Sequence, residues 1–415
     1  MKIIVVSASL PKGASEAFLI PEILEMRKQG HDVLLVPMHP RGGRVHSEAE
    51  ILDRMSLVRG LFDAGILAGS LISFLFRPRA TVRTLASIVK RSRNFPILCK
   101  NLAVFPKGLW LANLARKWGA EHIHSYWIST SATLAMVAAS IARRPWSATA
   151  YRWDIAENNM IAEKSQSASF IRVADRNGTD ELARLTSERG CPFHTIHSGA
   201  TLPDAGVNMF LDEARLLGIQ ETNTGIGQKS ILVPAMFVPK KGHAYLVDAM
   251  ALLSRKGGNF RCLFVGDGPL LEETKRRIDK AGLTSNAVFA GAVSHTALLG
   301  LMNPLFSDVV VLPSVETEDG EKEGIPMSLI EAMAQGIPVI ATRTGGIPEL
   351  LDDGCGIMVE QRDALSLCQA IETVFHKAPA VDAMVKNSRQ RIVDDYSAPA
   401  IVARLCALFE DARAR

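Results

Sequence analysis

The sequence predicts an α/β protein with two parallel-sheet domains that face a cleft, the first of them carrying a basic helical insertion. Short apolar runs alternate with helical patterns in two series, at about 1–200 and 230–395. A polar, weakly patterned stretch, 201–229, separates them and is predicted to be the connection between the domains. A last helix, within 396–415, is a candidate to cross back to the first domain.

The first series opens with a βαβ unit. The apolar run KIIVVS at Lys2–Ser7 predicts a strand, a loop containing Gly13 follows, and a helix then extends to about Gln29. The run DVLLVP at Asp32–Pro37 predicts the second strand. Loops of this kind lie at the carboxyl edge of a parallel sheet, where ligands bind. Further strands are predicted at HIHS, SATAY, FIRVAD and HTIHS, between 122 and 198.

The insertion, at about 47–119, has an uneven charge. From Ala64 to Ala120 the sequence has no Asp or Glu but ten Lys and Arg residues. Its apolar run AGILAGSLISFLF, Ala64–Phe76, has 13 residues, whereas a membrane-spanning helix needs about 20. Two interpretations stay open: a core helix beside a solvated basic face, or a surface that docks on an anionic membrane. No nucleic-acid recognition motif accompanies the basic residues.

The second series has predicted strands at SILVPA, RCLFVG, AVFAG, DVVVLPS and IPVIA. Two of the loops after these strands carry candidate ligand-binding residues. Lys241 precedes a predicted helix, where it is either a solvated surface lysine or a cation that neutralises a diphosphate. Gly266 and Gly268 form a tight turn, although a G-x-G alone is a weak signal. In the first domain, Tyr151–Asp154 end a strand and are either a structural turn or part of the cleft.

The most informative stretch is EKEGIPMSLIEAMAQGIPVIATRTGGIPELL, at Glu321–Leu351. Pro326 is suited to the start of a helix, so the backbone N–H groups at 324–327 are expected to be free to bind an anion or a hydroxyl. Glu323 precedes this helix. Glu331 follows seven intervening residues later, about one and a half turns into the helix. Together these groups suit a polyhydroxylated ligand that carries phosphate.

Four motifs together resemble the retaining glycosyltransferases of family 4, among them enzymes of exopolysaccharide and surface-glycan synthesis. They are KKG at Lys241, GDGP at Gly266, E-x7-E from Glu323 to Glu331, and TGGIPEL at Gly345. The resemblance covers nearly the whole second domain and extends to the first through its opening βα unit, the segment YRWDI and the run IHSGATLP. It implies the GT-B fold, in which two Rossmann-like domains face a cleft.

The resemblance also implies a role for each matching residue. Glu323 would accept hydrogen bonds from the donor sugar, Glu331 would hold the ribose, and Lys241 would neutralise the leaving diphosphate. It implies no metal and no other cofactor, because Lys241 and helix dipoles take that role. The residues expected to be catalytic are Glu323, Lys241, Tyr151 and Asp154. Those expected to bind the donor are Gly13, Lys241, Gly266, Gly268, Val293, Glu323, Gly324, Ile325, Pro326, Met327 and Glu331.

Two positions depart from the family pattern. Ala235 and Met236 occupy the positions of a Gly-Arg pair whose Arg grips the diphosphate, and Tyr151 replaces a cleft histidine. Arg152 is one candidate for a substitute cation. These departures leave a non-catalytic pseudoenzyme, acting as a nucleotide-binding or scaffolding subunit, as an alternative. A nucleotide-sugar epimerase is a third candidate.

The expected partners are a nucleotide-sugar donor, a glycan or lipid-linked acceptor and an anionic membrane surface, without nucleic acid. The six cysteines have no metal-type or C-x-x-C spacing, which favours a reducing compartment. The first residues pass from an apolar run into a helical pattern rather than a cleavage site. We therefore expect a cytoplasmic protein, peripheral on the inner face of the membrane, that builds a surface polysaccharide or glycolipid.

Overall fold

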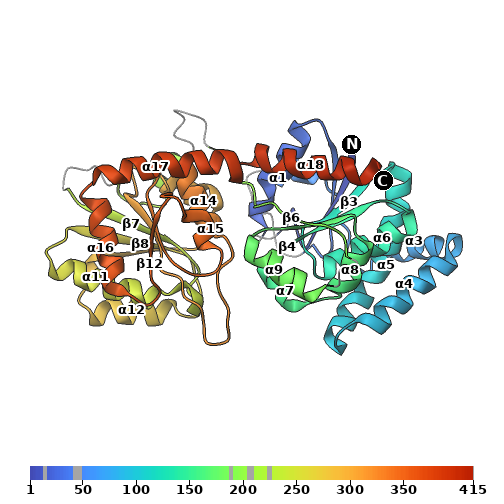
Figure 1. The fold of residues 1–415 in the computed structure, drawn as a ribbon, viewed down its shortest axis with the longest axis horizontal. Helices are drawn as coiled ribbons and strands as arrows, with labels where there is room; N and C mark the ends of the chain where they lie inside the picture. The colour runs from blue at the N-terminus through green and yellow to red at the C-terminus, as the bar shows by residue number, and fades with distance from the viewer. Residues whose placement is uncertain (13–15, 41–48, 187–189, 203–209, 222–226, 415) are drawn as a thin grey trace. The chain divides into compact units, whose positions relative to one another are not determined.

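The computed structural model describes residues 1–12, 16–40, 49–186, 190–202, 210–221 and 227–414 (Figure 1). The chain divides into two compact units, Met1–Gly199 with Ala398–Arg415, and Ala200–Ser397. Gly13, expected to bind the donor, lies outside the described residues.

The first unit is built on a parallel six-stranded sheet in the order β2-β1-β3-β4-β5-β6. The first two strands pair along their full length, with Val5 opposite Leu35. Both faces of the sheet are covered by helices, which is why its strands are continuous apolar runs in the sequence. The strands are β1 (Lys2–Ser7), β2 (Asp32–Pro37), β3 (His122–Ser125), β4 (Trp146–Ala150), β5 (Phe170–Val173) and β6 (Phe193–Thr195).

The helices of this unit include one from the far end of the chain, α18, whose Phe409 lies in the same apolar cluster as Val5. Gln29, at the end of α1, donates a hydrogen bond to the carbonyl of Pro399 at 3.3 Å. The helices are η1 (Ala17–Leu19), α1 (Ile20–Lys28), α2 (Ala49–Arg54), α3 (Ala64–Phe76), α4 (Pro78–Arg91), α5 (Phe95–Trp118), α6 (Thr130–Ala142), α7 (Arg152–Glu157), α8 (Ile161–Ser167), α9 (Arg176–Leu185) and α18 (Ala398–Ala414).

The described part of the basic insertion is mostly helical, and α5 is its central helix. The hydroxyl of Ser73 in α3 donates to the carbonyl of Leu109 in α5 at 2.6 Å. Lys107 of α5 is fully buried and donates to the carbonyls of Pro37 at 2.6 Å and Arg59 at 2.7 Å. Burial lowers the pKa of Lys107 to about 8. One of the ten basic residues is therefore a structural anchor between α5 and the end of β2.

The second unit contains a second parallel six-stranded sheet, in the order β12-β11-β10-β7-β8-β9. The strands are β7 (Lys229–Pro234), β8 (Phe260–Val265), β9 (Ala287–Gly291), β10 (Val309–Leu312), β11 (Val339–Thr342) and β12 (Ile357–Val359). Strand order reverses next to β7, since the chain adds β8 and β9 on one side and returns to add β10 on the other. Such a reversal is where open parallel sheets bind ligands, at the carboxyl ends of the strands.

The helices of the second unit cover both faces of this sheet. Figure 1 shows α11, α12 and α16 on one side of β7 and β8, and α17 on the other. Part of the stretch predicted as the connection between domains forms α10, which lies within the second unit and packs against α13. The helices are α10 (Leu211–Leu216), η2 (Pro239–Lys241), α11 (His243–Arg255), α12 (Leu271–Lys280), η3 (Thr284–Asn286), α13 (His295–Leu301), α14 (Met327–Ala334), α15 (Ile347–Leu351), α16 (Ala364–Phe375), α17 (Pro379–Arg391) and the π-helical turn η4 (Ile392–Tyr396).

No helix among the described residues combines the length and the apolarity needed to cross a bilayer. All six cysteines are free thiols, and four of them are buried as small apolar side chains. Cys191 is half-buried, and Cys99 lies exposed on α5.

Candidate functional site

The carboxyl edge of the second sheet brings together two residues that are far apart in the sequence, Lys241 and Glu323. The Lys241 Nζ lies 2.7 Å from Glu323 Oε1, and the two side chains are 16% and 8% exposed. The hydroxyl of Ser314, just after β10, donates to the same Glu323 oxygen at 3.2 Å. Lys241 is thus a partly buried cation in an ion pair, which disfavours the alternative of a solvated surface lysine.

The second carboxylate of the motif, Glu331, lies in α14 and is almost buried. Its Oε1 is 2.8 Å from Nε2 of His295, the first residue of α13. Sequence reasoning did not find His295. Its position right after a strand and a short loop was the available signal, because polar residues at that edge of the sheet face ligands.

The start of α14 differs by one residue from the prediction. Pro326 is the N-cap rather than the first helical residue, and α14 begins at Met327. The carbonyl of Pro326 accepts a hydrogen bond from the N–H of Leu329 at 3.1 Å. The N–H groups of the first helical turn have no acceptor within the helix. Those of Gly324 and Ile325 lie in the segment between Glu323 and this helix.

The turn TRTGG packs directly on the backbone of Glu323. Gly345 has a φ of +56°, and a Cβ there would lie 1.8 Å from the carbonyl oxygen of Glu323. The N–H of Gly346 donates to that same oxygen at 3.2 Å. Only glycine fits at 345, so this turn positions the Glu323 segment.

The GDGP turn has an equally close contact. A Cβ at Gly266, where φ is +148°, would lie 2.2 Å from the carbonyl oxygen of Ala235. The neighbouring Gly268 approaches the carbonyl of Phe237 in the same way. These glycines therefore allow the loop after β8 to contact the loop after β7 at the carboxyl edge of the sheet. Val293 is half-buried in the loop before α13 and packs against the core of this unit.

In the first unit, Asp154 is fully buried and caps the start of α7. Its Oδ1 accepts the N–H of Tyr151 at 2.7 Å, and its Oδ2 accepts the N–H of Ile128 at 2.6 Å. Burial raises the pKa of Asp154 to about 7, and the two backbone hydrogen bonds partly oppose this rise because they stabilise the charged carboxylate. With one backbone donor on each oxygen, Asp154 is placed to position this loop.

Tyr151 lies among aromatic rings next to that cap. Its ring centroid is 5.5 Å from Phe18 and 4.9 Å from Trp127, and its hydroxyl oxygen is buried. Burial raises the pKa of Tyr151 above its usual value, so the hydroxyl stays neutral. Arg152, the candidate substitute cation, lies 3.5 Å from a carboxylate oxygen of Glu181 and 3.8 Å from one of Asp175. Its charge is balanced within the first unit.

Two buried carboxylates of the first unit were missed by sequence reasoning. Glu22, in α1, pairs with both terminal nitrogens of Arg172 at 2.6 and 2.8 Å and accepts the hydroxyl of Tyr126 at 2.8 Å. Glu16 accepts three consecutive backbone N–H groups, at 8–10, and the indole N–H of Trp127. Both carboxylates precede or begin an amphipathic helix, where an acidic residue ordinarily faces solvent, so nothing in the pattern marked them as buried.

Comparison with known proteins connects this geometry to a family. Residues 219–391 match the family model described as glycosyl transferases group 1. A putative colanic acid biosynthesis glycosyltransferase, WcaL of Escherichia coli, is 31% identical over 234 residues, which are 56% of this chain and 55% of WcaL. The amylovoran biosynthesis glycosyltransferase AmsK of Erwinia amylovora is 28% identical over 181 residues, 43% of this chain and 44% of AmsK. The matched stretch thus spans about half the length of these curated relatives.

Solved structures resemble the chain over nearly its whole length. HepE from Anabaena in complex with UDP-glucose has a TM-score of 0.69 at 16% identity, with 99% of this chain and 100% of HepE covered. Sucrose-phosphate synthase from Thermosynechococcus elongatus has a TM-score of 0.68 at 18% identity, with full coverage of both chains. The predicted fold class is confirmed: the chain has the GT-B fold, with two Rossmann-like domains, and its residues 219–391 match the model of the glycosyl transferases group 1 family.

Proposed function

We propose that this protein is a retaining glycosyltransferase. It would move a sugar from a nucleotide-sugar donor to a surface polysaccharide or glycolipid acceptor at the cytoplasmic membrane face. The observation that carries the proposal is the carboxyl edge of the second sheet, where the Lys241–Glu323 ion pair is formed within the family segment. The names of WcaL and AmsK, which refer to colanic acid and amylovoran, support the acceptor class.

Lys241 and Glu323 would act on opposite charges of the transition state. An ammonium group has three donors, so Lys241 can keep its bond to Glu323 and still donate to a diphosphate oxygen. The leaving diphosphate would thereby be neutralised without a metal ion. Glu323 would accept hydrogen bonds from sugar hydroxyls and stabilise the positive charge that develops at the anomeric carbon. The first-turn N–H groups of α14 would face the sugar and the β-phosphate.

Glu331 would hold the ribose of the donor. A carboxylate accepts about four hydrogen bonds, and the contact to His295 uses only part of this capacity, which leaves room for ribose hydroxyls. His295 would orient the Glu331 carboxylate. Gly266, Gly268 and Val293 would border the base, as expected from the resemblance.

In the first unit we assign different roles to the two residues expected to be catalytic. Asp154 would position the loop through its two backbone hydrogen bonds, while Tyr151, with its buried neutral hydroxyl, would pack that loop against Phe18 and Trp127. The pseudoenzyme alternative rests on one observation in the second unit. Met236 is 62% exposed at the position where the family pattern has a diphosphate-gripping Arg, so one charge of that clamp is absent.

The proposed membrane contact is carried by α3 and α4. Ile66, Ser70 and Ser73 bury one face of α3. Its opposite face exposes large apolar side chains: Leu67 (49%), Leu71 (60%), Ile72 (45%), Phe74 (41%), Leu75 (68%) and Phe76 (73%). The following segment exposes the basic residues Arg79, Arg83, Lys90, Arg91 and Arg93. Of the two interpretations left open by the sequence, this arrangement favours docking, because an apolar helix beside basic groups suits an anionic bilayer.

The direct test of the enzyme proposal has two parts. Thermal-shift measurements with a panel of nucleoside diphosphates and sugar nucleotides identify the base and sugar, because a ligand that binds the folded state raises apparent stability. A transfer assay with the stabilising donor and isolated lipid-linked glycan then measures turnover. Binding without hydrolysis or transfer from any donor favours the pseudoenzyme, and conversion of the donor without an acceptor favours the epimerase.

A further inference from the structure

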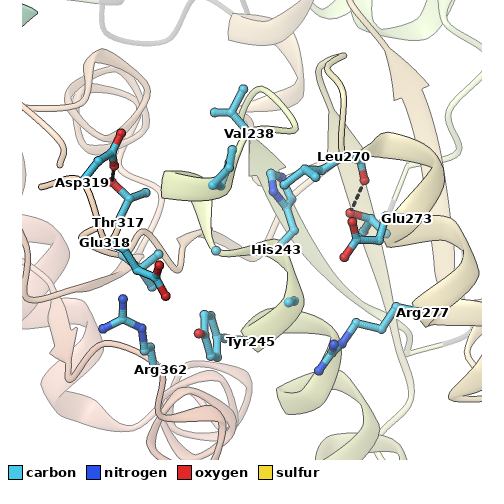
Figure 2. Close-up of a pocket in the computed structure, with 15 residues that line it drawn as sticks. Val238, His243, Tyr245, Leu270, Glu273, Arg277, Thr317, Glu318, Asp319 and Arg362 are labelled. Carbon is cyan, nitrogen blue, oxygen red and sulfur yellow. Dashed lines mark hydrogen bonds between the residues drawn. The ribbon is translucent and has the colours of Figure 1, made fainter. Parts of the chain in front are cut away.

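The second unit contains a cavity of about 570 Å³, and none of the described residues that are expected to bind the donor lines it. It lies between the start of α11, the first turns of α12 and the loop at 315–319 (Figure 2). Glu331 and His295 lie on α14 and α13, whereas α11 and α12 cover the other face of the sheet. This follows from right-handed crossovers, which place helices on opposite faces when the strand order reverses.

The cavity contains a histidine with unmet hydrogen-bonding groups. His243 is 4% exposed, and neither ring nitrogen has a hydrogen-bond partner among the described residues. Its ring stacks on Phe237 with the centroids 4.4 Å apart, and Figure 2 shows it between Val238 and Leu270. Burial lowers the pKa of His243 to about 4, so the neutral ring has one N–H donor and one acceptor nitrogen. A hydroxyl group both donates and accepts, so one that reaches the ring can pair with either nitrogen.

The charged residues around the cavity argue against an anionic ligand. Both guanidinium groups already have partners: Arg277 binds Asp248 at 2.7 and 2.8 Å, and Arg362 donates to the carbonyl of Glu316 at 2.6 Å. Three acidic residues line the same space, Glu273, Glu318 and Asp319. A phosphate or carboxylate ligand would therefore be repelled, because the acidic residues around the cavity outnumber the positive groups that are available to bind it.

The remaining lining suits a sugar ring. Tyr245 provides an aromatic face, and Val238 and Leu270 provide apolar surface close to His243 (Figure 2). Carboxylates accept hydrogen bonds from hydroxyls, and an aromatic face covers the apolar side of a pyranose. The cavity size is within the range of about 300–1,000 Å³ of small-molecule sites.

The walls of the cavity are held in place by contacts to the loop that carries Lys241. The N–H of Val315 donates to the carbonyl of Lys240 at 2.8 Å, and Lys240 Nζ lies 2.7 Å from Glu321 Oε1. The site is therefore preformed in the described chain. From these observations we propose that the cavity binds a neutral saccharide of one or two units, separately from the nucleotide-sugar donor. For a protein that builds glycans, such a site would hold part of the glycan itself, an interpretation that rests on the proposed function.

Saturation-transfer NMR on the full chain tests whether the cavity binds a neutral saccharide, with the methyl α-glycosides of glucose, galactose and mannose as probes. The measurements are made with and without saturating UDP or GDP. We expect a signal from at least one glycoside that persists with the nucleotide and in Glu331→Ala. The affinity should fall at least fivefold in Tyr245→Ala and in His243→Phe, which keeps the ring on Phe237 but removes both nitrogens. Glu318→Gln, on an exposed loop, is a variant that does not threaten folding and should weaken binding at least twofold.

The proposal is overturned if no glycoside gives a signal, or if UDP, GDP or Glu331→Ala removes it. Equal affinity in wild type, His243→Phe and Glu318→Gln overturns it as well. These results are distinct from failure of the enzyme proposal, which is measured by transfer from a nucleotide sugar and by the Lys241 variants. Melting temperatures of all variants establish that each is folded.

Discussion

The carboxyl edge of the second sheet and the α3–α4 surface of the first unit use charge in opposite ways. At the sheet edge, Lys241 is paired with a carboxylate that is 8% exposed, and Glu331 is paired with His295. On α3 and α4, basic groups are exposed beside apolar side chains such as Leu75, which is 68% exposed.

This difference shows what each surface is suited to bind. Buried, paired charges are oriented before a ligand arrives, and a small ligand needs that orientation at each of its polar groups. Exposed charges beside apolar groups are not oriented for one ligand geometry. They suit a partner that is large, flat and negatively charged, which a bilayer is.

The largest expected effect comes from removing the cation at the sheet edge. Lys241→Ala leaves the almost buried Glu323 without its partner and removes the charge proposed to face the diphosphate. We expect nucleotide-diphosphate affinity to fall about 100-fold, which is about 2.7 kcal/mol, with at least as large a loss of transfer. Isothermal titration calorimetry measures the affinity.

The neighbouring Lys240 provides a matched control. It pairs with Glu321, whose side chain is 54% exposed, so Lys240→Ala should change affinity less than threefold, as for other exposed pairs. Equal losses in the two variants would show that overall positive potential, rather than the Lys241–Glu323 pair, controls donor binding.

The second effect concerns the α3 surface. Leu71→Glu with Leu75→Glu places two carboxylates on the exposed apolar face, and we expect partition onto vesicles with 30% anionic lipid to fall about 30-fold. Sedimentation with vesicles at low and high salt measures it. For comparison, Leu216→Glu alters an 86% exposed leucine on α10 in the second unit and should leave partition unchanged.

Two outcomes would contradict the membrane proposal. One is equal partition of wild type and the double variant. The other is partition that depends neither on anionic lipid nor on salt, since Debye screening weakens an exposed electrostatic contact.

A smaller effect is expected at Glu331. Glu331→Gln keeps the shape of the side chain but removes its charge, and we expect affinity for a nucleoside diphosphate to fall about tenfold, because hydrogen bonds to a charged acceptor are worth about 1.5–3 kcal/mol. A 2′,3′-dideoxy nucleoside diphosphate is the control ligand, and it should bind wild type and Glu331→Gln equally. If the variant weakens both ligands alike, Glu331 does not hold the ribose.

The smallest effect at neutral pH concerns the stability of the first unit, which we expect to fall as the solution becomes acidic. His122 is fully buried in β3, where burial lowers its pKa from 6.5 to about 3. The unfolded chain therefore binds a proton as pH falls below 6.5 while the folded chain does not, so stability is lost between pH 6.5 and about 3. The loss from this residue is about 1.4 kcal/mol per pH unit.

Chemical unfolding of wild type and His122→Phe at pH 7 and pH 5 measures the contribution of His122 to the pH dependence of stability. The variant should lose less stability between the two pH values, by about 2 kcal/mol. Equal pH dependence of the two proteins would show that other groups, such as the nearby buried His124, account for the acid sensitivity.

Much of the fold was predictable from local pattern. Both faces of a parallel sheet are covered, so runs such as KIIVVS and DVLLVP are apolar throughout, and β1 and β2 have the predicted bounds of Lys2–Ser7 and Asp32–Pro37. Helix ends were less certain, as Pro326 shows: a proline suits both the N-cap and the first turn. Lys241, Gly266 and Gly268 were candidates because they follow strand ends, which converge at one edge of a sheet. Val293 and the role of each residue came from the family resemblance.

What the sequence alone determined is the set of chemical groups at that edge and the alternation that folds them into two parallel sheets. Which groups pair was decided only by tertiary structure. Lys241 and Glu323 meet across strands that are neighbours in the sheet, and Glu331 meets His295 from another helix. In the first unit, too, tertiary structure decided the partners of Asp154, whose two carboxylate oxygens each accept a hydrogen bond from a backbone N–H group. Periodicity reports which face a residue occupies, whereas a contact depends on strand order, which no local pattern contains.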